Sequence, residues 1–385
     1  MKMLNAWTVE IDELDVAVAQ IIEQLDMENS LLAHSAGFIT CSYEYVEAGT
    51  VESICKALPF DVVGCTTLTN SNNQRSGILL LCLSVLTADD CLFSTALTRH
   101  LEGDICANVD EAFQRASASL DDPPGLILAF MPMVSAISGE DMLGALDRAA
   151  GGAPIFGTVG CDSDPANFEH TYTIHNGICA KDRMSMLLIS GRVTPRFVVC
   201  NAAEHNLYKQ QAIITASEGN ILKEVNNVSA RDYFASIGLM HDDGLEAVSS
   251  VPFVIDSHDG SQAFARAIYT INDDGSAICG GTMPEGGTLS IGRLNISDIL
   301  VTTERSLNQI LANENLNGVI MFPCLGRNVV LGATPLRGID KVREMLGHSL
   351  PWHLAYSGGE VCPVRNNMGD VVNRFHNFTF IACAI

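Results

Sequence analysis

An alternation between short apolar runs and amphipathic segments sets the fold class of the first 160 residues. Apolar runs of strand length lie at 61–67, 78–86 and 125–130, and helix-like segments lie at 109–120 and 139–150. Short strands that alternate with helices are typical of layered α/β folds. We therefore expect an α/β N-terminal domain with a mostly buried sheet, preceded by an amphipathic helix over residues 11–25.

The pattern changes from about residue 172 onward. Strand-like segments then dominate, and helical segments such as 229–239 are isolated. This indicates an α+β C-terminal domain that is richer in strand. The charged and polar passage at 203–206 is the expected boundary, which gives domains at 1–202 and 203–385. Because no flexible linker composition occurs there, we expect the two domains to pack tightly.

Net charge excludes several classes of partner. The chain of 385 residues has 22 Lys and Arg against 45 Asp and Glu, a net charge of −23. This charge repels phosphate backbones and anionic lipid surfaces, so we expect neither nucleic acid nor membranes as partners. The N-terminus becomes acidic before an apolar signal segment can form, and the apolar run at 77–86 has the length of a buried strand. A cytoplasmic location is the expectation.

Cysteine usage argues against structural metal and disulfides. The 13 cysteines include no CxxC pair, and most lie in apolar runs, which favours free buried thiols. One loop does combine possible ligand types, but its spacing matches no standard metal site, so solvated loop residues are the simpler interpretation. The residues of this loop are Cys161, Asp162, Asp164, His170 and His175.

Three glycine-containing turns follow or interrupt apolar runs, at 62–67, 155–162 and 321–327. Strand ends in α/β sheets are where ligand crevices open, and glycine allows close approach of the backbone. Arg327 offers a fork to a carboxylate and Glu360 an acceptor to an amine, with Tyr356 nearby in sequence. A structural Arg–Glu pair is the alternative. No sequence signature of a known catalytic or nucleotide-binding motif is present.

Many segments in order along the chain resemble the FIST family, whose members carry an N-terminal and a C-terminal FIST domain. The resemblance covers nearly the full length. It implies a signal-transduction protein of the bacterial and archaeal type that binds a small ligand, amino acids among them. The segments that carry it are VVGCTTLT (62–69), LILAFMPMVSAISGEDMLGAL (126–146), GGAPIFGTVGCDSD (151–164), VNNVSARDYFASIGL (225–239), GSAICGGTMPEGGTLSIGR (275–293), MFPCLGR (321–327), GEVCP (359–363) and FHNFT (375–379).

The resemblance also implies a set of ligand-binding residues. The family commonly continues with Gly-Glu-Ile after the first glycine-cysteine turn, whereas this chain reads TTLTNSNNQRSG. We therefore expect the polar side of a pocket in the C-terminal domain, with a smaller contribution from the first turn. The candidates are Arg327, Glu360, Tyr356, Cys324, Asn377, His376 and Gly359, with Cys65 and Thr66 from the first turn. His376 and Asn377 have an alternative role, the satisfaction of buried backbone groups.

The resemblance and the lack of a catalytic signature favour a non-enzymatic sensor for an amino acid or small carboxylate. Family members are often fused to output modules, and none is found here. The resemblance therefore implies a separate partner such as a histidine kinase, a diguanylate cyclase or a chemoreceptor.

Two alternatives stay open. Some FIST proteins resemble haem-dependent sensors of nitric oxide, and Cys362-Pro363 with His376 offers possible haem ligands. The chain could also be an enzyme with Cys65 or Cys324 as nucleophile, since Arg327 could lower the pKa of the nearby Cys324 thiol. No histidine is clearly placed to act as its base.

Overall fold

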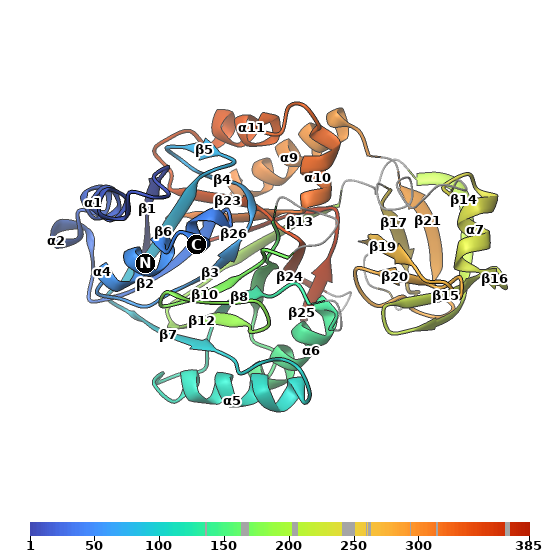
Figure 1. Ribbon diagram of the computed structural model, residues 1–385, viewed down its shortest axis with the longest axis horizontal. Helices are drawn as coiled ribbons and strands as arrows, with labels where there is room; N and C mark the ends of the chain where they lie inside the picture. Colours follow the sequence, from blue (N-terminus) through green and yellow to red (C-terminus); the bar gives the residue numbers. More distant parts are fainter. Residues whose placement is uncertain are drawn as a thin grey trace.

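The computed structural model describes residues 1–134, 137–162, 169–201, 207–240, 251–258, 260, 263–292, 294–312, 315–365 and 370–385. Within these ranges the chain forms a large core of three sheets and a smaller strand-rich part, which lies to the right in Figure 1. We call residues 207–292 the insert and the remainder the core. A helix begins at Leu14 and ends at Leu25, so the predicted amphipathic helix is confirmed.

The three core sheets repeat one topology. In each, the first strand pairs antiparallel with the last, the last pairs antiparallel with the second, and the second pairs parallel with the third. The first sheet contains β1 (Lys2–Thr8), β6 (Leu81–Ala88), β2 (His34–Cys41) and β3 (Val62–Thr66). The second contains β7 (Cys91–Leu97), β12 (Ser185–Gly191), β8 (Leu126–Met131) and β9 (Ile155–Val159). The third contains β13 (Arg196–Asn201), β26 (Thr379–Ala384), β22 (Val319–Pro323) and β23 (Trp352–Tyr356).

Hairpins exchanged between neighbouring sheets close the core into a ring. Each hairpin follows the third strand of one sheet and pairs with the third strand of another. The hairpin β4 (Leu68–Asn72) and β5 (Ser76–Gly77) joins β23, β10 (Thr173–His175) and β11 (Ile178–Ala180) join β3, and β24 (Gly359–Arg365) and β25 (Val371–His376) join β9. Each sheet is therefore completed by a segment from another repeat.

Helices cover the outer faces of the three sheets. Apolar clusters separate the helices from the strands on each side. The first sheet is covered by α1 (Leu14–Leu25), α2 (Met27–Ser30), α3 (Glu44–Glu47) and α4 (Thr50–Ala57), the second by α5 (Ile105–Ser117) and α6 (Gly139–Ala150), and the third by α9 (Ile296–Leu311), α10 (Leu325–Leu331) and α11 (Arg337–Leu346). Strands with an apolar layer on each face read as continuous apolar runs, which explains the alternation seen in the sequence.

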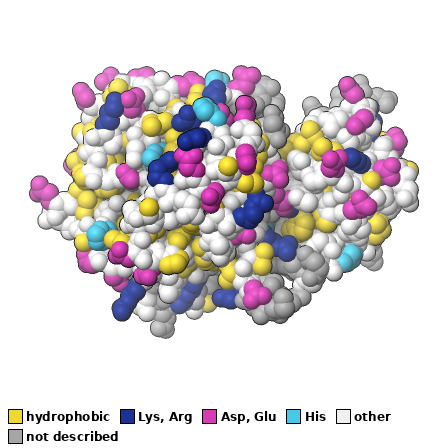
Figure 2. Space-filling view, turned by 90° about the horizontal axis from the view of Figure 1, so that it is seen from below, with side chains coloured by type: hydrophobic (Ala, Val, Ile, Leu, Met, Phe, Trp, Pro, Cys, Tyr) yellow, Lys and Arg dark blue, Asp and Glu magenta, His cyan; other side chains and the backbone are white. Residues whose placement is uncertain are grey.

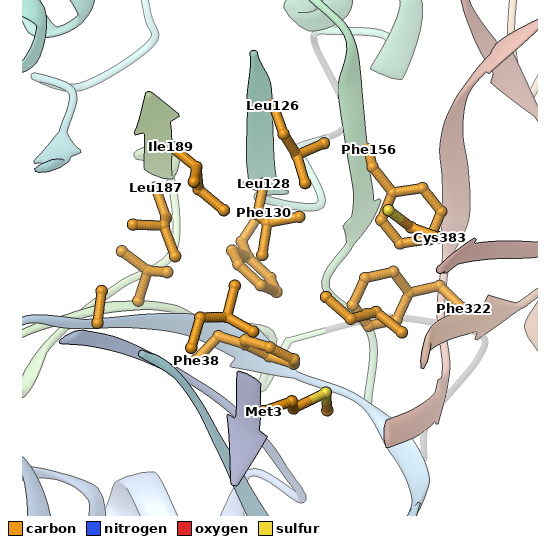
Figure 3. Close-up of a cluster of buried hydrophobic side chains, with 14 of the residues drawn as sticks. Met3, Phe38, Leu126, Leu128, Phe130, Phe156, Leu187, Ile189, Phe322 and Cys383 are labelled. Atoms are coloured by element: carbon orange, nitrogen blue, oxygen red, sulfur yellow. The ribbon is translucent and has the colours of Figure 1, made fainter. Parts of the chain in front are cut away.

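The inner faces of the three sheets meet in a central apolar cluster. Phe38, Phe130 and Phe322 come from the first, second and third sheet, and Figure 3 shows their rings in the middle of this cluster. The ring centroids of Phe38 and Phe130 are 6.1 Å apart, as are those of Phe130 and Phe322. Because every sheet contributes, none of the three can hold its inner face out of water alone.

The insert has its own sheet and its own apolar cluster. Its strands and helix are β14 (Leu207–Glu218), β15 (Ile221–Val225), β16 (Val228–Ser229), α7 (Ala230–Ser236), β17 (Phe253–Asp256), β18 (Phe264–Arg266), β19 (Ile268–Ile271), β20 (Ala277–Cys279) and β21 (Thr288–Gly292). The predicted α/β first part and the strand-rich second half are confirmed. The core strand β13 ends at Asn201 and the insert begins with β14 at Leu207, and after the insert β22, β23 and β26 complete the third core sheet. Within the described ranges, every helix is too short or too polar to cross a bilayer.

Candidate functional site

Glu360 is a buried carboxyl group with an unused oxygen. On β24 it pairs with Thr158 of β9 and His376 of β25, and its side chain has no exposed surface. Its Oε2 accepts hydrogen bonds from the backbone N of Thr379 at 3.3 Å and from its Oγ1 at 2.8 Å. Its Oε1 has no geometrically defined hydrogen-bond partner among the described residues, and the Cys324 thiol, a weak donor, is in contact with the carboxyl group. Burial raises the pKa of Glu360 to about 8, because an ionised carboxylate is poorly stabilised there.

Cys324 lies beside this carboxyl group. It follows β22 and precedes α10, and its backbone N donates to the carbonyl oxygen of Thr379 at 2.9 Å. Its side chain is buried. Burial raises the pKa of the Cys324 thiol well above its usual range, and the negative charge of Glu360 raises it further. The thiol therefore stays protonated near neutral pH.

Tyr269 and Gly280 of the insert lie next to the part of the core that holds Glu360 and Cys324. A methyl group on Gly280 would lie 2.8 Å from the hydroxyl oxygen of Tyr269 and 2.5 Å from Oδ1 of Asn377 in the core. Tyr269 as a whole residue is 44% exposed, while its hydroxyl lies against Gly280. Burial, followed by the charges of Cys324 and Glu360, raises the pKa of this hydroxyl. We call Glu360, Cys324, Thr379, Asn377 and Tyr269 the Glu360 site.

A small hollow of about 10 Å³, with room for about one water molecule, lies next to the Glu360 site, between the core and the insert. Figure 2 shows a notch in the outline where the two parts meet, with acidic side chains spread over this face of both. Thr379 lines the hollow and also binds the carboxyl group of Glu360. The lining residues are Val199, Asn201, Ala263, Phe264, Val364, Arg374, His376 and Thr379.

Arg327 and Tyr356 lie on another face. Arg327 Nη2 donates at 3.0 Å each to the Ile299 carbonyl oxygen and to the hydroxyls of Thr302 and Thr303, all on α9. Its guanidinium lies over the ring of Phe380, 5.6 Å from the centroid. Successive strand side chains point to opposite faces, so Phe380 and Arg327 lie on the face of β26 opposite to Thr379 and Glu360. Tyr356 packs in the same outer cluster as Phe380.

Arg327 and Glu360 were both expected to bind the ligand, but the structure gives them different partners. Arg327 binds α9 to the third sheet, and it forms no ion pair with Glu360. Glu360 is thus left without a cationic partner in direct contact, which explains why burial dominates its pKa.

Three further candidate residues, Gly359, Cys65 and Thr66, occupy structural positions. A methyl group on Gly359 would lie 2.5 Å from the Phe375 ring, so glycine is needed there for close packing. Cys65 belongs to the central apolar cluster, and burial raises the pKa of its thiol well above the usual range. Thr66 links two repeats, since its backbone N donates to the Tyr172 carbonyl oxygen at 2.8 Å and its carbonyl oxygen accepts from the Cys161 N at 3.0 Å.

Cys362 and His376, the alternative haem ligands, are not both free to coordinate an iron ion. The carbonyl oxygen of Cys362 can only accept, so Nε2 of His376 carries the proton of their 3.2 Å hydrogen bond. Burial lowers the pKa of His376 to about 3, which keeps the ring neutral. The Cys362 side chain has no exposed surface and packs in the central apolar cluster. These two residues therefore do not fit axial coordination of haem without repacking of the core.

The side chains of the loop that contains possible metal ligands are hydrogen-bonded to other residues, separately from one another. His170 Nδ1 lies 2.7 Å from an oxygen of Glu47, and His175 Nε2 lies 3.1 Å from the Thr95 hydroxyl. Asp164 lies outside the described residues. Within the described ranges no group of three or more His, Cys, Asp or Glu side chains is arranged to hold a metal ion.

Sequence reasoning missed the contribution of the insert. Gly280 lies 97 residues and Tyr269 lies 108 residues before Asn377, and no local pattern connects them. Gly280 does belong to the segment 275–293 that carries the family resemblance, and that segment was the available signal.

Comparison with known families identifies the family of this chain. A model of the FIST N domain matches residues 35–228, and a model of the FIST C domain matches residues 225–363. The first match covers half of the chain, and the chain belongs to the FIST family. FIST domains are sensory domains of signal-transduction proteins.

Other comparisons add less. The search of curated proteins found no match. Among solved structures, the crystal structure of cyanuric acid hydrolase from A. caulinodans is similar at 10% sequence identity with a TM-score of 0.38, over 100% of this chain and 98% of that chain.

Proposed function

We propose that this FIST protein is a non-enzymatic sensor that binds a small ligand at the Glu360 site and signals to a separate partner protein. The observation that carries the proposal is the unpartnered Oε1 of Glu360, a buried carboxyl oxygen at the junction of core and insert. Buried polar atoms are nearly always hydrogen-bonded, so an unused one marks a place where a ligand can contribute the missing group.

The ligand class follows from the two protonation states of this carboxyl group. An ionised Glu360 accepts hydrogen bonds, which suits the ammonium group of an amino acid. A protonated Glu360 donates one hydrogen bond, which suits a small carboxylate. With a pKa near 8, both states are accessible around neutral pH. The neighbouring amide of Asn377 and hydroxyl of Tyr269 supply further polar contacts from both parts of the protein.

The buried thiols support binding rather than catalysis. A cysteine nucleophile acts as the thiolate, and its pKa must be lowered for that purpose. Burial raises the pKa of both Cys324 and Cys65 instead. Neither thiol has a histidine as a hydrogen-bond partner among the described residues.

Signalling follows from the position of the site between two parts. A ligand that contacts Glu360 and Tyr269 together would change how the insert is held on the core, because it binds groups on both sides. A separate histidine kinase, diguanylate cyclase or chemoreceptor would then read the position of the insert.

Native mass spectrometry of protein purified without added ligand tests the proposal. We expect a retained small mass that is displaced by amino acids or small carboxylates and is lost in Glu360→Gln. The variant Glu218→Gln, which removes an exposed ion pair with Lys223 in the insert, is the control and should retain the mass. A retained haem, or a mass that Glu360→Gln does not affect, contradicts the proposal.

A further inference from the structure

A ligand cannot reach Glu360 while the junction is closed. The side chain of Glu360 has no exposed surface, and that of Cys324 is 6% exposed. Tyr269 and Gly280 of the insert lie above them. Access to the unpartnered Oε1 therefore requires the insert to move relative to the core. The groups that hold the insert in place decide how often this happens.

One carboxylate of the core binds two groups of the insert. Glu140 lies in the first turn of α6, and its two oxygens accept hydrogen bonds from the guanidinium of Arg266 and from the backbone N of Thr282. Arg266 is 2% exposed, whereas the Glu140 side chain is 23% exposed. Because the Glu140 carboxylate is partly exposed, water can replace Arg266 as its hydrogen-bond partner. The ion pair can therefore break without leaving Glu140 unsolvated.

Two further hydrogen bonds cross the junction to neutral groups of the core, and the guanidinium of Arg374 in the core lies over the Phe264 ring of the insert, 5.8 Å from its centroid. Arg266 Nη1 donates to the Phe375 carbonyl oxygen at 3.1 Å, and the backbone N of Ala267 donates to Asn377 Oδ1 at 3.4 Å. The second of these is long for a hydrogen bond and correspondingly weak. Hydrogen bonds to charged groups contribute about twice as much as those between neutral groups. Among these hydrogen bonds, those that Glu140 accepts from Arg266 and Thr282 are therefore the strongest.

The end of β25 connects this contact to the Glu360 site. Phe375 and Asn377 bind Arg266 and Ala267 of the insert, while His376, the residue between them, is paired with Glu360 on β24. Of these three consecutive residues, the first and third contact the insert, and the second lies beside Glu360. A displacement of the insert at Arg266 must act on the backbone that flanks Glu360.

We propose that the Glu140–Arg266 pair is a gate that controls access to the Glu360 site. The inference rests on the proposed function in one respect, since it takes Glu360 as the group that a ligand must reach. When the pair is made, Tyr269 and Gly280 cover the site. When it breaks, the insert moves away from α6, and Glu360 and Cys324 become accessible together.

The alkylation rate of Cys324 reports the gate without any ligand. We would treat the full-length protein with iodoacetamide and measure modification of each cysteine by peptide mass spectrometry. In Glu140→Gln we expect Cys324 to react about tenfold faster than in the unmodified sequence, since glutamine has one acceptor oxygen for the two donors, Arg266 and the Thr282 N–H, and Arg266 loses its counter-charge. Cys383 lies in the central apolar cluster and is the internal reference, which should not change.

A matched control separates the gate from a general helix effect. Glu52 also lies in the first turn of a core helix, α4, and its ion pair with Lys56 is exposed. Glu52→Gln should leave the rate at Cys324 unchanged. An unchanged rate in Glu140→Gln, or an equal rise at Cys324 and Cys383, overturns the gate. The labelling experiment contains no ligand, so failure of the ligand proposal in mass spectrometry leaves its result intact, and the two can fail independently.

Discussion

The centre of the core and its junction with the insert are both buried, but they are stabilised by different interactions. Three sheets share the central cluster around Phe38, Phe130 and Phe322, and exchanged hairpins tie the sheets into a ring. The junction instead depends on a few hydrogen bonds, of which those to Glu140 are charged. Apolar burial over a large area holds the core as a unit, whereas a small polar junction can open at modest cost. The comparison separates a rigid scaffold from a part that can respond to a ligand.

The largest effect is expected at the centre. Phe322→Ala should lower the free energy of unfolding by about 3–5 kcal/mol, because a large buried ring is lost and a cavity remains. Both tryptophans, Trp7 and Trp352, lie in the core, so their fluorescence during urea unfolding follows the core alone. Val301→Ala, at a side chain that is 61% exposed, is the control. A similar small effect of both substitutions would contradict a central cluster shared by three sheets.

Because of Glu360, the free energy of unfolding should decrease as the pH rises. Its pKa is raised from 4.5 to about 8 in the folded protein, so between these values the folded state binds more protons than the unfolded state. The stability contributed by the neutral carboxyl group is therefore full below about pH 4.5 and is lost as the pH rises through about 8. Each pKa unit corresponds to about 1.4 kcal/mol, so the effect amounts to a few kcal/mol.

Urea unfolding at pH 5.5 and pH 8.5 measures this dependence. The unmodified protein should lose stability relative to Glu360→Gln as the pH rises, because glutamine mimics the neutral carboxyl group and does not titrate. A gain relative to Glu360→Gln over the same range would mean that the carboxylate is stabilised by a positive group, and that the site is already satisfied.

Gly280→Ala should act on the junction and spare the core. The added methyl group would meet Asn377 Oδ1 at 2.5 Å, and such overpacking typically costs about 1–3 kcal/mol. We expect faster hydrogen exchange in residues 264–283 and 371–378 and an unchanged tryptophan transition. Gly144→Ala, where a methyl group meets nothing within 4 Å, is the matched control. Loss of the tryptophan transition in Gly280→Ala would show that core and insert unfold together.

The sequence predicted the parts of the fold that depend on local pattern. The helix at Leu14–Leu25 and the buried strands such as Leu126–Met131 follow from hydrophobic periodicity. The exchange of hairpins could not be predicted, because strand pairing between distant segments leaves no local signature. Thr69–Asn73 is an example: this stretch is entirely polar, yet all five residues are buried, and most of them form β4 of the third sheet.

The residues of the candidate site that belong to local sequence patterns were predicted, and those that meet only through long-range contacts were not. Glu360 and Cys324 lie together in the structure, with Asn377 beside Gly280 of the insert, and glycine turns and the family resemblance had marked all three residues. Arg327 was marked by the same signals, but strand alternation turns Thr379 and Phe380 to opposite faces and leaves Arg327 with α9. Tyr269, Arg266 and Glu140 were missed because their role arises only when the insert meets the core.

Isothermal titration calorimetry of the protein and of Glu360→Gln, with amino acids and small carboxylates as titrants, tests the central claim most directly. We expect at least one of these compounds to release or absorb heat on binding to the unmodified protein, and this heat to disappear in Glu360→Gln while Glu218→Gln retains it. Binding that persists unchanged in Glu360→Gln, or no heat from any titrant, would contradict a ligand site built on the unpartnered oxygen of Glu360.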